Sequence, residues 1–96
     1  MPNEVSIDIQ DKTLTKLAGY ELGYKLYKDY VELKIDVSKP FTIKFPSQID
    51  YLAASFIVGF FGDIYNQIGA DGIHANMNIE SNISNIADIE KTLLVM

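Results

Sequence analysis

The sequence predicts a small two-layer α/β domain, with a mostly parallel or mixed sheet and helices packed on one face of it. Two observations lead to this prediction. Apolar residues recur at period two in some stretches and at helical period in others, in the order strand, helix, strand, helix, strand, helix. The predicted strands also alternate apolar and polar side chains, whereas strands covered on both faces are apolar throughout. We therefore expect a second sheet face that is at least partly open.

Length and composition predict one domain over residues 1–96 that folds without a cofactor. The chain is 48% apolar and 22% charged, which lies in the ordinary globular range. It contains no cysteine, which excludes disulfides, thiolate zinc sites and cysteine nucleophiles. The start of the sequence lacks the features of a signal peptide, and no apolar run approaches the ~20 residues of a membrane span. We therefore expect a cytoplasmic protein.

The charge pattern argues against nucleic acid and membrane surfaces as partners. The formal net charge is −5, and every basic residue is a lysine. Arginine is the side chain whose planar fork suits phosphates and base edges, and nucleic-acid binders carry clustered basic patches. Here the lysines are scattered and outnumbered by carboxylates.

The first half of the chain reads as a strand followed by a helix. Val5, Ile7 and Ile9 alternate with polar residues, as expected of a strand buried on one face. Residues 13–31 change to helical period, and Asp11 or Thr13 is the expected N-cap. Residues 31–37 fit either a strand or a continued helix, and we favour an extended helix end.

The second half predicts a strand, a strongly apolar helix, a third strand and a last helix. The strand covers residues 41–45, and the helix runs from about Asp50 to a stop at Gly69. The third strand covers residues 72–79, and the last helix begins near Ser84. The open sheet face is expected to carry Asp8, Thr42, Lys44, His74, Asn76 and Asn78.

No catalytic constellation is evident. His74 is the only histidine, no serine lies in a Gly-x-Ser-x-Gly turn, and no second group of ligands accompanies the histidine, so we expect neither a catalytic residue nor a metal site. Gly59 and Gly62 lie inside a helical pattern, and Gly69 and Gly72 flank a helix-to-strand turn. Neither pair follows a strand and opens a helix, as phosphate-binding loops do.

A stripe of small residues on the second predicted helix is the most informative local pattern. Interior glycines each cost about 1 kcal/mol relative to alanine, so two of them suggest that something approaches closely. That neighbour is either a partner protein or another helix of the same domain, and both interpretations stay open. The stripe consists of Ser55, Gly59, Gly62 and Asn66, flanked by Tyr51, Leu52, Phe56 and Val58.

At this helix the sequence resembles the STAS-like family of small bacterial domains, relatives of the anti-sigma-factor antagonists. The resemblance covers most of the chain, from Gly19–Gly23 through the strand Phe41–Phe45 to Ala53–Phe61. A strand, a short polar turn and a helix that opens on a Ser-Phe pair are its most recognisable part. The resemblance implies a non-enzymatic domain that binds a regulatory protein.

The resemblance also implies a candidate phosphoacceptor. In the antagonist relatives, a kinase-type anti-sigma partner phosphorylates the serine of an Asp-Ser-Ser-Gly turn at this helix start, and the complex then dissociates. The matching residue here is Ser55. Ala53 and Ala54 stand where that pattern has aspartate and serine, and Phe56 replaces its glycine. Ser55 is also expected at or beyond the first helical turn, where the helix dipole fades.

Three hypotheses follow for function. The preferred one is a protein-interaction module, a partner-switching regulator that binds a histidine-kinase-type ATPase through the second helix. The second is a homodimer or other homo-oligomeric structural subunit without a switching role. The third is a small-ligand-binding or hydrolytic protein that uses His74.

Overall fold

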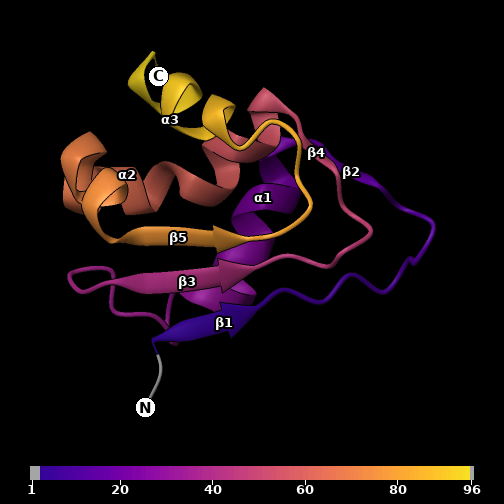
Figure 1. Ribbon diagram of the computed structural model, residues 1–96, viewed down its shortest axis with the longest axis horizontal. Helices are drawn as coiled ribbons and strands as arrows, with labels where there is room; N and C mark the ends of the chain where they lie inside the picture. Colours follow the sequence, from indigo (N-terminus) through magenta and orange to yellow (C-terminus); the bar gives the residue numbers. More distant parts are fainter. Residues whose placement is uncertain (1–2, 96) are drawn as a thin grey trace.

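The computed structural model describes residues 3–95 and arranges them as three parallel strands backed by helices, with a short two-stranded sheet beside them (Figure 1). The elements in chain order are β1 (Glu4–Ser6), β2 (Lys16–Leu17), α1 (Tyr20–Leu26), the π-helical turn η1 (Tyr27–Val31), β3 (Phe41–Lys44), β4 (Tyr51–Leu52), α2 (Ala54–Asn76), β5 (Met77–Glu80) and α3 (Ala87–Leu94).

The main sheet has the strand order β1-β3-β5, and all of its pairs are parallel. The smaller sheet pairs β2 with β4, also in parallel. Helices connect the strands of the main sheet, as parallel pairing requires. The α/β class and the small two-layer architecture predicted from the sequence are confirmed.

The two faces of the main sheet differ in polarity, as the alternation predicts. Val5 and Ile43 lie side by side and face the core. On the opposite face Lys44 forms ion pairs with Glu4 at 3.3 Å and with Glu80 at 3.7 Å. Thr42 and Asn78 lie on this face too, so the expectation of an open polar face is confirmed at the positions that are in strands.

The first helix begins later than predicted. Residues 16–17 form β2, and Gly19, with φ 100°, directs the chain into α1 at Tyr20. Asp11 caps a turn instead of this helix, because its carboxylate accepts hydrogen bonds from the Thr13 hydroxyl and backbone N–H. These bonds hold the pKa of Asp11 below its usual value.

The second helix is displaced toward the C-terminus relative to the prediction. Residues 50–52 are extended, and α2 begins at Ala54. At Gly69, with φ 70°, the helix kinks but does not end, and its second limb continues to Asn76. Ile73 is buried while Ala75 is exposed, so the apparent alternation across residues 72–76 does not reflect a strand. The third strand is therefore only Met77–Glu80, and His74 and Asn76 are helical.

The remaining boundaries differ less. The helix that starts at Tyr20 ends at Val31, and residues 32–34 form a turn, so the ambiguous stretch 31–37 contains no strand. The last helix begins at Ala87, later than Ser84. None of the helices in residues 3–95 is both long enough and apolar enough to cross a membrane.

Helices α1 and α2 approach each other through two glycines. A Cβ added at Gly59 would overlap the backbone of Tyr20, and one added at Gly23 would lie 2.5 Å from the carbonyl oxygen of Phe56. Beneath this contact the rings of Phe56 and Phe60 stack at 5.6 Å, and both are fully buried. The neighbour that the glycines admit is thus a helix of the same domain.

We predict opposite effects of alanine at two glycines of α2. Gly59→Ala should lower the free energy of unfolding by about 3 kcal/mol or more, because the new methyl group meets backbone that cannot move alone. Gly62→Ala should raise it by about 0.5–1 kcal/mol, because the space around Gly62 is open and alanine favours the helix. Urea unfolding followed by circular dichroism measures both, and equal effects would show that the helices do not touch at Gly59.

Candidate partner-binding site

Ser55 lies where the starts of two helices meet. It is the second residue of α2, whose N-cap is Ala53, so it falls within the first turn and not beyond it as expected. Its exposed hydroxyl oxygen accepts a hydrogen bond of 3.0 Å from the backbone N–H of Gly19, the N-cap of α1. The helix has no capping side chain of its own. The site therefore combines an accessible hydroxyl with backbone N–H groups at a helix N-terminus.

Strand β4 sets the position of this helix start. On one side β4 pairs with β2, and the N–H of Ala53 continues the ladder by donating to the carbonyl of Leu17 at 2.9 Å. On the other side the amide of Asn85 binds both backbone groups of Leu52: its oxygen accepts at 3.0 Å and its nitrogen donates at 2.7 Å. The Asn85 side chain thus acts as a third strand, and it ties the segment before α3 to the start of α2.

Two exposed tyrosines lie near Ser55. Tyr20 directly follows Gly19 and is 54% exposed, and Tyr51 on β4 is 40% exposed. The ammonium of Lys16 lies 5.8 Å from the centre of the Tyr51 ring, and the Tyr20 ring stacks on that of Tyr24. Sequence reasoning missed Tyr20. The usable signal was its place after Gly19 on the polar side of a helix, where a large aromatic residue has no core to enter.

The predicted stripe on α2 is divided between the core and the surface. Leu52, Phe56 and Gly59 are buried within the domain, so they are corrected from partner-binding to internal packing residues. The helix begins after residue 52, and α1 covers Gly59. The remaining members reach the surface to different degrees: Val58 and Gly62 are half-buried, and Tyr51, Ser55 and Asn66 are exposed.

His74 does not lie on the open sheet face. It is an exposed residue of the second limb of α2, and its Nδ1 atom lies 3.2 Å from a carboxylate oxygen of Glu90 on α3. A histidine beside a carboxylate is one part of a base-activated nucleophile, but a hydroxyl or thiol must complete it. The hollow beside His74 is lined by residues that carry neither group.

The described residues offer no further chemical group from which to assign a function. Within residues 3–95 no three side chains of histidine, aspartate or glutamate gather closely enough to hold a metal ion. Comparisons of the chain with protein-family models, with curated proteins and with solved structures found no match.

We predict that Asn85 is needed to hold the start of α2. Asn85→Ala should lower the free energy of unfolding by about 2 kcal/mol, because it leaves both backbone groups of Leu52 without partners in a half-buried place. Asn82→Ala is the matched control and should cost about 0.5 kcal/mol, since Asn82 makes one exposed bond to the carbonyl of Ser47. Thermal unfolding compares the two, and similar losses would contradict the role assigned to Asn85.

Proposed function

We propose that this chain is a non-catalytic protein-binding module whose binding surface centres on Ser55, and that phosphorylation of Ser55 releases the partner. The observation that carries the proposal is the placement of an exposed serine hydroxyl in the first turn of α2, against the N-cap of α1. The resemblance to STAS-like domains, noted at the same residue, supports a histidine-kinase-type ATPase as the partner.

The surroundings of Ser55 suit a phosphate group. Transfer of a phosphoryl group from ATP forms an O–P bond at the Ser55 oxygen, with ADP and the hydroxyl proton as the other products. The product carries about −1.5 to −2 charges at neutral pH, which a helix N-terminus favours. The N–H of Gly19, which now donates to the hydroxyl, is a further donor for a phosphate oxygen.

The exposed tyrosines supply binding surface around the switch. Tyr20 and Tyr51 present apolar rings with polar tips, the kind of residue that contributes most to protein interfaces. A dianion placed between such rings would have to be desolvated when a partner packs against them. Binding and phosphorylation are therefore mutually exclusive in this proposal.

Capture of the partner from native cell extract tests the proposal. The unmodified chain should retain one protein with an ATPase domain, and Ser55→Glu and Tyr20→Ala should each reduce the retained amount by about tenfold or more. Ser6→Glu is the matched control, because Ser6 is an exposed serine on the open face of the main sheet. It should leave capture unchanged.

Incubating the captured complex with ATP tests the switch separately. Intact-mass spectrometry should find one added phosphate on the chain, fragmentation should place it on Ser55, and the partner should dissociate. Ser55→Ala should gain no phosphate and should stay bound. Phosphate at another residue, or capture that survives both Ser55→Glu and Tyr20→Ala, would contradict the proposal.

A further inference from the structure

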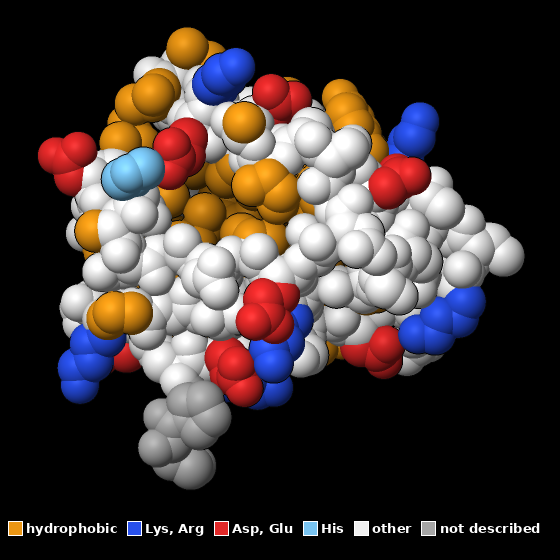
Figure 2. Space-filling view, viewed as in Figure 1, with side chains coloured by type: hydrophobic (Ala, Val, Ile, Leu, Met, Phe, Trp, Pro, Cys, Tyr) orange, Lys and Arg blue, Asp and Glu red, His pale blue; other side chains and the backbone are white. Residues whose placement is uncertain are grey.

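Strand β5 is an edge strand, and an apolar hollow lies beside its free edge. In residues 3–95 the main sheet pairs β5 with β3 on one side and with no strand on the other. The hollow has a volume of about 310 Å³, with β5 as one wall and the start of α3 as the other. Figure 2 shows it as an opening with a hydrophobic floor near the middle of the molecule.

The free edge presents backbone groups that lack a strand partner. The carbonyl of Glu80 accepts a hydrogen bond from the N–H of Phe45, so it points toward β3. Successive residues of a strand direct their backbone groups to opposite sides, so the N–H and C=O of Ile79 are directed to the free edge. Proteins commonly block such edges with proline, lysine or a bulge. The sequence of β5, Met-Asn-Ile-Glu, has no lysine or proline.

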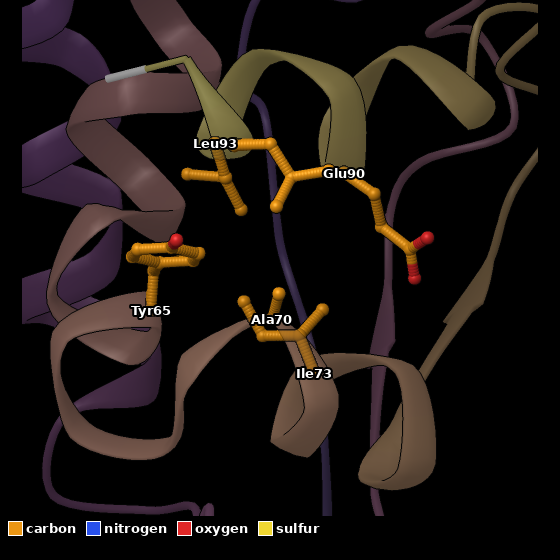
Figure 3. Close-up of a pocket in the computed structure, with 6 residues that line it drawn as sticks. Tyr65, Ala70, Ile73, Glu90 and Leu93 are labelled. Atoms are coloured by element: carbon orange, nitrogen blue, oxygen red, sulfur yellow. The ribbon is translucent and has the colours of Figure 1, made fainter.

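The floor and walls of the hollow are incompletely covered apolar side chains. Met77 and Ile79 of β5 are half-buried, and Ile86, just before α3, is 37% exposed. A second cavity of about 40 Å³ lies between the two limbs of α2 and α3. There Tyr65, Ile73 and Leu93 point toward one another, whereas the Glu90 carboxylate points away (Figure 3). These contacts hold α3 in place as a wall, and Glu90 also lines the larger hollow.

Charge selects the occupant. Glu90 lines the hollow, Glu80 ends β5, and no lysine is among the residues that line the hollow. A strand added beside β5 would turn alternate side chains toward the apolar floor and the others toward the face that carries Asn78 and Glu80. That requires apolar residues alternating with basic ones. A second copy of this chain fits poorly, because it has a net charge of −5 and would bring Glu80 and Glu90 of two copies together.

We propose that the edge of β5 binds an extended segment of a partner protein in which apolar and basic residues alternate, by adding it as a strand to the main sheet. The backbone of Ile79 pairs with the segment, and its apolar side chains fill the hollow between β5 and α3. This is a second binding surface, separate from that at Ser55, and it does not depend on the function proposed above.

The probe is the capped peptide Lys-Val-Lys-Val-Lys-Val-Lys, added to the full chain and followed by amide nuclear magnetic resonance. Shifts should be confined to β5 and residues 81–90, and hydrogen exchange of the Ile79 amide should slow by about tenfold or more at saturation. Replacing the central valine of the peptide by proline, or all of its lysines by glutamate, should weaken binding by about tenfold. Equal binding of the proline peptide would overturn the proposal.

Variants of the chain locate the site. Ile86→Asp should weaken peptide binding by about tenfold or more, and Glu90→Gln by about threefold. Leu33→Asp is the control, because Leu33 is 91% exposed and lines a different hollow with Asn3 and Lys39. It should bind like the unmodified chain, as should Ser55→Glu.

Two results would overturn the proposal. One is the absence of localised shifts at a peptide concentration of about 2 mM, above the range expected for even a weak peptide complex. The other is a dimer in sedimentation experiments that Ile86→Asp abolishes, which would assign the hollow to a second copy of the chain.

Discussion

The close approach of α1 and α2 at Gly23 and Gly59 is the contact on which the rest of the structure depends. Two helices packed through side chains lie about 8–10 Å apart, whereas glycines let backbone meet backbone. Here the start of α1 rests directly on the first turns of α2. The large rings of Phe56 and Phe60 are thereby turned to the core side of α2, where Phe45 from the end of β3 meets them.

The same contact determines what lies at the start of α2. Gly19 can donate to the Ser55 hydroxyl only because α1 begins beside the first turn of α2. The pairing of β2 with β4 fixes both helix starts from below, and Asn85 holds β4 from the other side. A surface serine is thus supported by backbone from three separate parts of the chain. Such support gives a modification at that serine a defined geometry.

The two proposed surfaces use different physical principles. At Ser55, an exposed hydroxyl and tyrosine rings form a convex surface whose binding is switched by charge. At β5, backbone groups of an edge strand and an apolar hollow select an extended segment, and acidic side chains set its charge. The kink at Gly69 creates the second surface, because it turns the last limb of α2 back so that β5 can begin at Met77.

Sequence patterns predicted the elements that bury one regular face. The strand at residues 41–45, the apolar helix after residue 50 and the open polar sheet face with Thr42, Lys44 and Asn78 were all predicted. Ser55 was also identified, with its role still a proposal. The patterns failed where short elements depend on distant partners. β2 and β4 are two residues each, too short for any periodicity, and they exist only because they pair with each other.

The sequence by itself determined the class of the fold, because alternating and helical periods follow from which side chains must leave water. It did not determine which neighbour the glycines of α2 admit. That was decided by the tertiary structure, in which α1 occupies the space that a partner was equally expected to fill. The kink at Gly69 was likewise read as a helix stop, because a glycine that ends a helix and one that bends it look the same until the next residues find their packing.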